Sequence, residues 1–504
     1  MSEAGVELVA LGDHAWRFSL PGTCDRPRLL AALLALDGIV DVVLAEDQGA
    51  AILAEGAAPA SVRLALALAL ALGVASTVTP PARGRLHSIP VCYDGEDVPA
   101  LAGVLGLTTD ALIALHAHRD YEVAMVGFMP GFAYLRGLDP RLVLSRRGSP
   151  RTRVPARSVA IAAGYTGIYP FASPGGWHLL GEAVGFTPFD ARGAALALGD
   201  RVRFEPVARV AASQALGTAS LPAASSRTPR LEVRGARGPA LLVDGGRPGH
   251  MHEGVPHGGP MLRGGLARAN AAVGNGRGAC AIEIYGALDV IARGGRINVG
   301  DDLGGGRVLE DGEVLSVATE GRARVRYIAI EGGFDVPLVL GGRGTMLVAG
   351  MGGHEGRALR REDRLVANAS ADANANANAN ANANASGNAE DERHLIAIAI
   401  GPDASEGEIE ALVGTTFTVA AASDRTGTRL EGSPLGASVH SARDRQSGPM
   451  VRGAIERTPA GPIVLGPDHP TTGGYPIIAV LREAAMDRFF ALPIGHRVRF
   501  VTRT

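Results

Sequence analysis

The sequence predicts a mainly β protein, with a small α+β unit at its N-terminus and two β-barrel regions in tandem. Short apolar strands separated by Gly and Pro fill most of the chain beyond the N-terminal unit, a pattern typical of barrels and sandwiches. Two motifs also occur twice. Thr-Gly-x-Tyr-Pro stands at 166–170 and 472–476, and Gly-x-Arg-Val-Arg-Phe at 199–204 and 495–500. We interpret the second motif as a strand that closes similar barrels, and the first as equivalent turns that either close the barrels or line a site. We interpret the halves as related domains, so a site at or between them is the first place to look for function.

Residues 1–82 are predicted to form the α+β unit. Alternating apolar residues indicate strands, and longer periodic apolar runs indicate helices. We expect strands at 15–20, 39–44 and 51–54, and helices at 26–36 and 61–72. Thr79-Pro80-Pro81 then ends the unit.

The two barrel regions follow. Residues 83–207 are expected to form the first, with one helix at 110–116. Residues 208–229 are Ala, Ser, Thr and Pro without periodicity and are interpreted as a linker. Residues 230–504 are expected to form the second region. An Ala-Asn alternation at 367–392 interrupts it and cannot bury a core, so we interpret it as a disordered loop expansion.

The composition argues against several classes of partner. Among 504 residues, 49 basic side chains stand against 51 acidic ones, and the formal net charge of −2 gives no basic surface for nucleic acid or anionic lipid. Cys24, Cys92 and Cys280 match no metal-ligand spacing, so we expect buried thiols in a reducing compartment. No signal peptide or membrane span is apparent, and a cytoplasmic protein is expected.

The chain contains no lysine, so every basic side chain is arginine or histidine. A Walker-type phosphate loop, a Schiff-base mechanism and a covalently attached biotin or lipoyl arm each need a lysine, and all are excluded. Any phosphate or carboxylate must therefore be held by arginine forks, backbone N–H groups or a metal.

Two groups in the first half suit ligand binding. An aromatic loop that contains Phe128, Phe132 and Tyr134 either lines a pocket or forms a turn of the core. A proline-flanked loop carries three arginines, which suit a carboxylate or phosphate because guanidinium binds both bidentately. These are Arg151, Arg153 and Arg157, and a solvated surface cluster is an equal alternative.

The second half offers further polar groups. Asp244 and Arg247 are predicted to form an orienting pair. A metal site built from Asp244 and three histidines is disfavoured, because the histidines stand in glycine-rich turns rather than on one helix face. They are His250, His252 and His257. Glycine loops at 341–345 and 350–357 offer N–H groups to an anion. Arginines and carboxylates within 423–432 serve proton transfer or carboxylate recognition, or brace a turn.

Long, ordered blocks of this sequence resemble the allophanate hydrolase subunit 1 and subunit 2 families. Those families include the B and C subunits of bacterial 5-oxoprolinase, sporulation kinase inhibitor proteins and the carboxyltransferase part of urea carboxylase. The first-half resemblance covers about residues 10–207 and rests on blocks at 89–93, 127–135, 150–155 and 164–177. The second-half resemblance covers about residues 230–504 and rests on blocks at 244–249, 254–256, 269–275, 424–432 and 471–476.

The resemblance implies cyclophilin-like β-barrels in both halves and a fusion of the B and C subunits in one chain. It also implies ATP-dependent hydrolysis of a cyclic amide, the opening of 5-oxo-L-proline to L-glutamate. Mg-ATP would bind here or together with a separate A subunit in a hetero-oligomer. Two alternatives stay open: the carboxyltransferase component of a biotin-dependent carboxylase, with biotin on another protein, and a non-catalytic binding protein of the histidine-kinase-inhibitor type.

Candidate roles follow from motif position and chemistry. The predicted catalytic residues are Asp244, Arg247, Asp424, Arg425 and Arg429. The predicted substrate- or nucleotide-binding residues, with the two tyrosines as pocket walls, are Arg151, Arg153, Thr166, Gly167, Tyr169, Thr472, Gly473, Gly474 and Tyr475. Four positions depart from the residues usual in the families, with Tyr165 and Glu456 in place of Gln, Leu262 in place of Asp and Gly342 in place of Ser.

Overall fold

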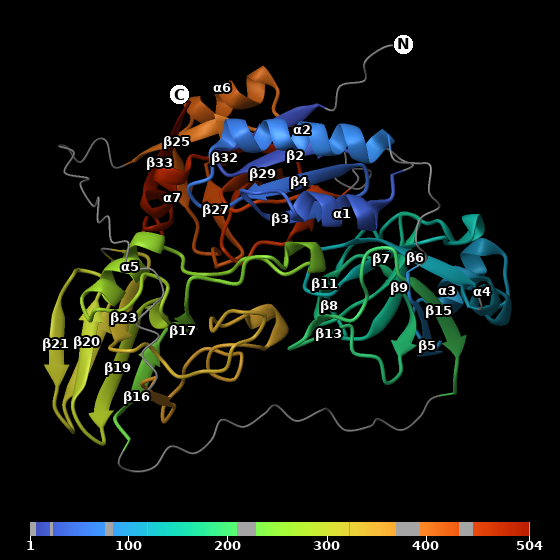
Figure 1. Cartoon of the computed structure of the whole chain (residues 1–504). Helices are drawn as coiled ribbons and strands as arrows, with labels where there is room; N and C mark the ends of the chain where they lie inside the picture. Colours follow the sequence, from blue (N-terminus) through green and yellow to red (C-terminus); the bar gives the residue numbers. More distant parts are fainter. Residues whose placement is uncertain are drawn as a thin grey trace.

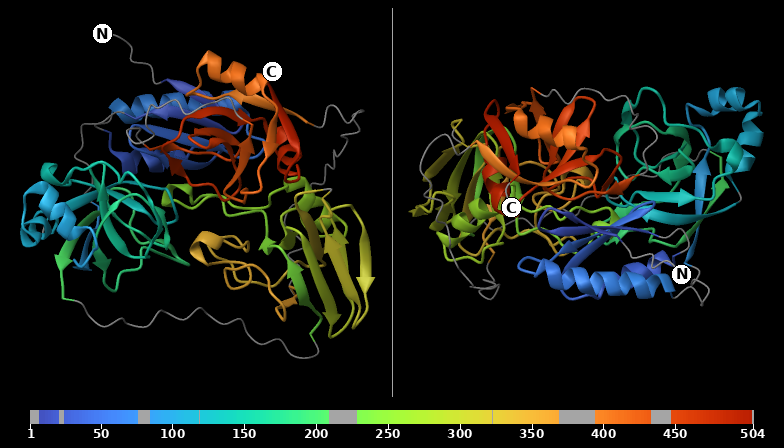
Figure 2. Two further views of the ribbon diagram at one scale, coloured as in Figure 1. Left: turned by 180° about the vertical axis from the view of Figure 1, so that it is seen from behind. Right: turned by 90° about the horizontal axis from the view of Figure 1, so that it is seen from above.

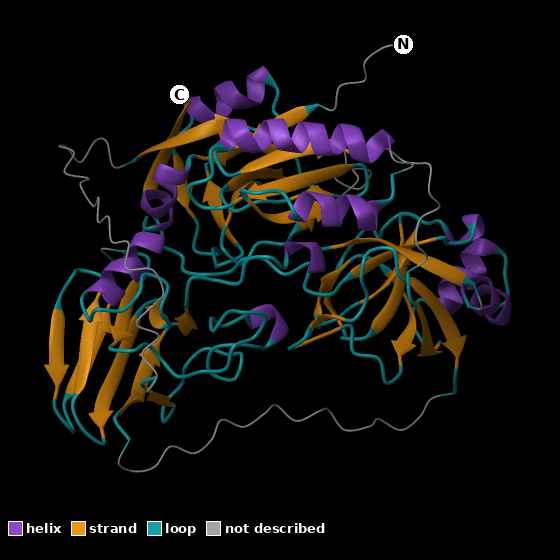
Figure 3. Cartoon of the chain, viewed as in Figure 1, coloured by secondary structure: helices purple, strands orange, loops and turns teal. Residues whose placement is uncertain are grey.

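The computed structural model describes residues 7–20, 24–75, 84–117, 119–208, 228–321, 323–368, 394–432 and 447–502. The predicted linker at 208–229 and the predicted insert at 367–392 fall almost wholly outside these residues and stay predictions. The described chain has four parts: an N-terminal α/β unit, a first barrel, a two-sheet sandwich and a second barrel (Figure 1). Strands dominate the two barrels and the sandwich, while the N-terminal unit combines a sheet with two helices (Figure 3), as the sequence predicts.

The N-terminal unit is a four-stranded antiparallel sheet in the order β1-β2-β4-β3. Its elements are β1 (Leu8–Leu11), β2 (Ala15–Ser19), α1 (Arg26–Leu34), β3 (Ile39–Leu44), β4 (Gln48–Leu53) and α2 (Pro59–Ala75). The predicted strands and helices are confirmed, while β1 was not predicted. Asp25 begins α1, because its side chain accepts the N–H of Arg28 at 3.2 Å.

The sheet of the N-terminal unit buries both of its faces. Alternate side chains of a strand point to opposite faces. One set, which includes Phe18, packs against Leu33 and other apolar residues of the two helices. The other set, which includes Leu11, packs against Val480 and its neighbours in the second barrel. The unit is therefore docked on the barrel at the far end of the chain, and both views show the two side by side (Figures 1 and 2).

Seven strands close the first barrel in the order β10-β7-β6-β15-β5-β12-β9. They are β5 (Leu86–Cys92), β6 (Asp120–Val126), β7 (Ala133–Arg136), β9 (Ser158–Ala162), β10 (Tyr165–Ile168), β12 (His178–Ala183) and β15 (Arg201–Pro206). The predicted helix at 110–116 is α4 (Thr109–His116), preceded by α3 (Val98–Leu105). Outside the barrel lie η1 (Pro140–Leu142), β8 (Arg151–Val154), β11 (Ser173–Gly175), β13 (Phe189–Asp190) and β14 (Gly193–Ala194).

The sandwich comprises two sheets, β22-β19-β16-β24 and β17-β18-β23-β20-β21, whose apolar side chains share one core. Its strands are β16 (Arg230–Arg237), β17 (Ala240–Val243), β18 (Ala281–Ile284), β19 (Ala287–Arg293), β20 (Ile297–Asp301), β21 (Gly306–Leu309), β22 (Val314–Ala318), β23 (Arg326–Ile330) and β24 (Arg364–Val366). Its helical segments are η2 (Met251–Glu253), α5 (Arg263–Ala271) and η3 (Leu347–Ala349). The sandwich and the first barrel lie at opposite ends of the molecule (Figure 1).

The second barrel repeats the first. Its cyclic order is β25-β32-β29-β30-β27-β26-β33. The strands are β25 (Leu395–Ile400), β26 (Phe417–Val419), β27 (Gly427–Glu431), β29 (Ala454–Thr458), β30 (Gly461–Leu465), β32 (Ile477–Leu481) and β33 (Arg497–Thr502). Beside them lie α6 (Glu406–Gly414), β28 (Gly448–Pro449), β31 (Thr472–Gly473) and α7 (Glu483–Phe490). The two closed seven-stranded barrels confirm the predicted tandem architecture.

The Gly-x-Arg-Val-Arg-Phe copies occupy equivalent strands. The first lies on β15, which pairs in parallel with β5, and the second on β33, which pairs in parallel with β25. Val202, Phe204, Val498 and Phe500 are fully buried, so the alternate apolar residues of the motif face the barrel cores. The interpretation of this motif as a barrel-closing strand is confirmed.

The two copies of Thr-Gly-x-Tyr-Pro match in sequence but lie at positions that are not equivalent in the two halves. The first copy lies on β10, a strand of the barrel, whereas the second lies on β31, which pairs with β28 outside the barrel. The topological counterpart of β31 is β11, which pairs with β8. The true counterpart of Gly473-Gly474-Tyr475 is therefore Gly175-Gly176-Trp177, and the prediction of equivalent turns is wrong.

Within the described ranges, no single helix combines the length and apolar character needed to cross a bilayer, and only the pair α3–α4, bent by 96°, passes that test by length and composition.

Candidate functional site

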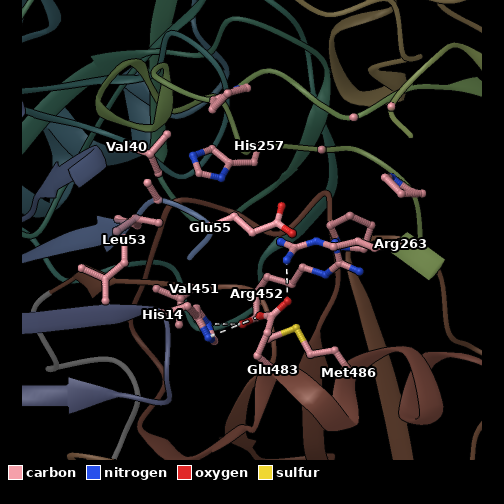
Figure 4. A pocket seen from close by; sticks show the side chains of 18 of the residues that line it. His14, Val40, Leu53, Glu55, His257, Arg263, Val451, Arg452, Glu483 and Met486 are labelled. Carbon is pink, nitrogen blue, oxygen red and sulfur yellow. Dashed lines mark hydrogen bonds and ion pairs between the residues drawn. The ribbon is translucent and has the colours of Figure 1, made fainter. Parts of the chain in front are cut away.

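A cavity of 520 Å³ lies where the N-terminal unit, the sandwich and the second barrel meet. The end of β4, the segment before α5, the start of α7 and the segment after β30 all contribute to its lining. Figure 4 shows His14 and Leu53 from the N-terminal unit facing Arg263, Arg452 and Glu483. Residues from both halves of the chain thus line one cavity.

Asp41 fixes the segment that forms one side of this cavity. It is fully buried on β3 and accepts the N–H of Met251 at 2.8 Å. The rings of His252 and His257 lie 3.4 Å and 3.3 Å from its two oxygens. Burial opposes ionisation, but the hydrogen bonds from the two histidines and from Met251 outweigh it and hold the pKa of Asp41 well below its usual range. These two histidines therefore gather around Asp41, a partner that the sequence did not indicate.

His469 presents a fixed hydrogen-bond acceptor. It lines the cavity, is 3% exposed, and its Nδ1 lies 2.7 Å from the carbonyl oxygen of Pro470. A carbonyl oxygen only accepts, so Nδ1 carries the proton and Nε2 holds a lone pair. Burial lowers the pKa of His469 to about 4, and nearby His257 and Arg452 act in the same direction. The ring is therefore neutral at pH 7.

Arg452 is a cation with spare hydrogen-bond donors. Its Nη2 donates to the carbonyl oxygen of Met261 at 2.8 Å, while its buried Nε has no partner in the described structure. Its guanidinium lies 5.4 Å from the centre of the Phe490 ring. Burial, assisted by the neighbouring Arg263, lowers the pKa of Arg452 to about 10. No carboxylate in the described part of the chain forms an ion pair with it, and the charge is still present at pH 7.

The remaining charges around the cavity are mostly paired. Arg263 donates to Glu483 at 2.5 Å, and the main-chain N–H of Glu483 donates to Asp13 at 3.0 Å. Arg277 also lines the cavity and is exposed, and it makes no ion pair within the described ranges. Arg277 is thus available to a ligand at this edge.

Leu262, where the families usually carry Asp, precedes the first turn of α5. Its side chain is buried in the apolar core and does not cap the helix. Asp487 of α7 takes that role, accepting the N–H groups of Arg263 at 2.8 Å and Gly264 at 2.6 Å. The N-terminus of α5 is therefore capped by an acid from the second barrel.

None of the predicted site residues lines the cavity. Asp244 accepts N–H groups of Gly246 and Arg343 at 3.0 Å and 2.5 Å, and so braces two turns. The buried Arg247 donates to the carbonyl oxygens of Val339 and Gly344. No direct hydrogen bond joins Asp244 to Arg247 in the described structure, and the two interact through charge, since Asp244 opposes the lowering of the Arg247 pKa by burial. Their neighbours Gly245 and Pro248 do reach the cavity.

Backbone N–H groups of the glycine loops, which were predicted to bind an anion, already donate to backbone carbonyl oxygens. The N–H of Gly342 donates to Val339, that of Gly353 to Arg343 and that of Gly356 to Gly352. A backbone N–H already bonded to a carbonyl offers little to a ligand. These loops are interpreted as structural.

Arg425 is part of the core. It is 6% exposed and donates to Glu283, to Asp468 at 2.7 Å and to the carbonyl oxygen of Gly259 at 2.7 Å. Asp424 closes a turn by accepting the N–H of Thr426 at 2.8 Å. Arg429 is exposed on β27, and the hydrogen bonds that it makes to described residues come from its main chain. The three are not gathered into one site.

The first-barrel candidates are also dispersed. Arg151 donates to Asp97 at 2.7 Å, whereas Arg153 is exposed. Thr166 is buried and lies 2.8 Å from Nε2 of His116. A side chain at Gly167 would clash with the first-barrel backbone. The arginine cluster thus has one structural member and two exposed ones, because Arg157 is exposed and pairs with Glu182.

Tyr169 is 1% exposed inside an aromatic cluster, 5.3 Å from the Phe132 ring, and does not line this cavity. Phe132 and Tyr134 belong to the same cluster, so the core-turn interpretation of that aromatic loop holds for both. Thr472 joins the barrels, because its hydroxyl accepts the N–H of Phe128 at 2.9 Å. Gly473 and Gly474 are half-buried and Tyr475 is 37% exposed, away from the cavity.

Two family models match the chain. One, described as "Carboxyltransferase domain, subdomain C and D", matches residues 7–197, and the other, described as "Carboxyltransferase domain, subdomain A and B", matches residues 303–502. The C subunit of 5-oxoprolinase from Escherichia coli (strain K12) is 32% identical over 278 residues, which are 52% of this chain and 87% of that relative. The chain belongs to the carboxyltransferase-domain family.

Other carboxyltransferase-domain relatives resemble the first half or the whole. The B subunit of 5-oxoprolinase from Bacillus subtilis (strain 168) is 44% identical over 101 residues, 19% of this chain. That match spans 42% of the relative, less than half its length. The crystal structure of TTHA0988 covers 99% of this chain and 100% of its own, with a TM-score of 0.80 and 28% identity. The predicted resemblance to the B and C subunits is confirmed, and TTHA0988 shares the whole architecture.

Sequence reasoning missed Arg452 and His469. His469 stands between Asp468 and Pro470, and Arg452 follows two buried apolar residues, without a recognisable motif around either. A signal did exist for one of them, since a histidine next to a proline in a short polar turn is a candidate for a tautomer fixed by a main-chain carbonyl. Nothing in the sequence places it beside the N-terminal unit.

Proposed function

We propose that this chain supplies the B and C parts of a 5-oxoprolinase in one polypeptide. With ATP and a separate A subunit, it opens 5-oxo-L-proline to L-glutamate in the cytoplasm. The proposal is carried by one observation: both halves line a single cavity that combines the spare donors of Arg452 with the neutral acceptor of His469. Relatives named as the B and the C subunits of 5-oxoprolinase support it.

The chemistry suits the groups present. A lactam is a poor electrophile, and transfer of a phosphoryl group from ATP to its carbonyl oxygen activates the carbonyl carbon for attack by water. The ring C–N bond then breaks as the nitrogen takes up a proton, and a second water hydrolyses the resulting acyl phosphate to glutamate and phosphate. Arginine forks stabilise both a substrate carboxylate and phosphate oxygens. Because the chain has no lysine, we assign the phosphates of Mg-ATP to Arg277, whose guanidinium has no partner within the described residues. Further groups of the nucleotide site come from the A subunit.

The test is glutamate release from 5-oxo-L-proline and ATP by this chain mixed with its A subunit, and by each protein alone. We expect release only from the mixture. Arg452→Met should lower kcat/KM by about tenfold or more, since a charge-assisted contact is lost. Arg307→Met, exposed on β21 and remote from the cavity, is the matched control. No release from a folded, assembled complex would contradict the proposal.

A second candidate is the carboxyltransferase component of a biotin-dependent carboxylase. The description of the two matching family models favours it. Biotin would arrive on another protein, since this chain offers no lysine to carry it. Transfer of labelled carboxylate from carboxybiotin to a small amide, without glutamate release, would select this function instead.

A further inference from the structure

The polar groups of the cavity differ in how far their hydrogen-bonding capacity is used. Arg263 is engaged by Glu483, and His257 by Asp41. The Nε2–H of His14 donates to the main-chain oxygen of Arg452 at 3.0 Å. Each of these groups therefore has a protein partner. Nε2 of His469 and the guanidinium of Arg452 keep unused capacity beside the cavity in the described structure, as do the buried Nδ1 of His14 and the exposed Arg277.

The unused capacity of Arg452 and that of His469 are complementary. Arg452 has five N–H donors, of which the described structure shows one bonded to Met261. His469 offers a single lone pair and no donor at Nε2, because Nδ1–H is committed to Pro470. The two are close enough for the charge of Arg452 to lower the pKa of His469. One residue thus suits a planar anion, and the other suits a neutral N–H.

We propose that Arg452 binds the carboxylate of the substrate and that Nε2 of His469 accepts its N–H. The cavity then selects small molecules that carry a carboxylate and an uncharged amide N–H on adjacent atoms. The choice of a lactam as the ligand rests on the proposed function. The proposal adds to that function the two residues that recognise the lactam. The pair acts in binding and is not assigned to bond breaking.

The same geometry disfavours a cyclic amino acid. A secondary ammonium would bring a positive charge beside Arg452 and Arg263, in a partly desolvated site where such repulsion is weakly screened. A lactam N–H brings no charge. A site that hydrogen-bonds an N–H also rejects an analogue that lacks it, because its acceptor is then left unpaired.

Binding is measured by isothermal titration on the full chain, alone and in complex with the A subunit, without ATP. The four probes are 5-oxo-L-proline, its N-methyl derivative, 2-pyrrolidinone and L-proline. We expect 5-oxo-L-proline to bind about tenfold or more tightly than each of the others. Arg452→Met should weaken 5-oxo-L-proline to the level of 2-pyrrolidinone and leave 2-pyrrolidinone unchanged. His469→Leu should bring the N–H and N-methyl forms to equal affinity.

His469→Gln, which keeps an amide donor and acceptor, should restore part of the preference for the N–H form. Arg307→Met should leave all four affinities unchanged, and circular dichroism confirms that each variant is folded. An unchanged ratio between the N–H and N-methyl forms in His469→Leu overturns the inference, as does failure of all four probes to bind either preparation. Selective binding of 5-oxo-L-proline without glutamate release would support recognition by Arg452 and His469 and contradict the proposed hydrolysis.

Discussion

Asp97 and Asp403 occupy corresponding positions in the two barrels. Asp97 accepts the N–H of Leu179 at the start of β12 at 2.7 Å, and Asp403 accepts that of Ile477 at the start of β32 at 2.9 Å. Their arginine partners come from different places. Arg151 of the same barrel donates to Asp97, whereas Arg17 of the N-terminal unit donates to Asp403 at 3.0 Å. The arginine that binds Asp403 of the second barrel thus comes from the N-terminal unit, far away in the sequence.

The pair Arg17–Asp403 is expected to fasten the N-terminal unit to the second barrel. In a double-mutant cycle with Arg17→Met and Asp403→Asn, the free energy of unfolding should show a coupling of about 1–3 kcal/mol, because both side chains are largely buried. The exposed pair Arg157–Glu182 in the first barrel should couple by less than about 1 kcal/mol. Equal coupling in the two cycles would contradict the proposed fastening role.

Arg425, predicted from sequence as catalytic, is expected to act on stability. Arg425→Met leaves Glu283 and Asp468 with uncompensated buried charge, and should lower the free energy of unfolding by about 3–5 kcal/mol. Arg499→Met, exposed on the same barrel, should change it by less than about 0.5 kcal/mol. Urea unfolding followed by fluorescence measures both. A stable Arg425→Met protein without activity would restore the catalytic interpretation.

Because of Glu456 on β29, the free energy of unfolding is expected to fall as the pH rises. It is 6% exposed, without a hydrogen-bond partner among the described residues, and burial raises its pKa to about 8. The folded state keeps the proton while the unfolded chain loses it above about pH 4.5. Stability should therefore decline between about pH 4.5 and pH 8, by up to about 5 kcal/mol, and then level off.

Glu456→Gln should remove this decline, since the amide has the same shape and no charge. Unfolding at pH 5 and at pH 8.5 should show a gain in stability that is much larger at pH 8.5. The same substitution at the exposed Glu431 should give no pH-dependent gain. An equal gain for Glu456→Gln at both pH values would show that the residue is charged in the folded state.

Asp487 should stabilise the N-terminus of α5 across the boundary between the sandwich and the second barrel. Asp487→Ala removes both acceptors from the N–H groups of Arg263 and Gly264, and should cost about 1–2 kcal/mol. Arg488→Ala, exposed on the same helix, should be nearly neutral. Hydrogen exchange at the first turn of α5 should accelerate in the Asp487 variant alone, which separates loss of the cap from general destabilisation.

Much of the fold was predictable because local patterns decide it. The alternation at 15–20 and the apolar face of 26–36 specify β2 and α1 without help from the rest of the chain. The Gly-x-Arg-Val-Arg-Phe repeat identified the closing strands of both barrels, since burial of alternate residues leaves a direct trace in sequence. Thr-Gly-x-Tyr-Pro misled, because turns with glycine and an aromatic residue recur in unrelated positions.

The candidate site was less predictable, because tertiary packing assembles it. Arg452 and His469 carry no motif, and their neighbours His14 and Arg263 come from distant segments. Conversely, Asp244 and Arg425 stand in ordered motifs, yet their oxygens and N–H groups are consumed by turns and core ion pairs. A motif shows that a residue is constrained, and whether the constraint is structural or chemical depends on which partners the fold brings to it.

The docking of the N-terminal sheet on the second barrel also sets an order of events during synthesis. Leu11 and Ile52 leave the ribosome long before Met450 and Val480, against which they pack, have been made. At about 5–20 residues per second, that apolar face waits roughly tens of seconds for its partner. The nascent chain must shield it for that time, and the first segment to be translated is among the last to reach its final environment.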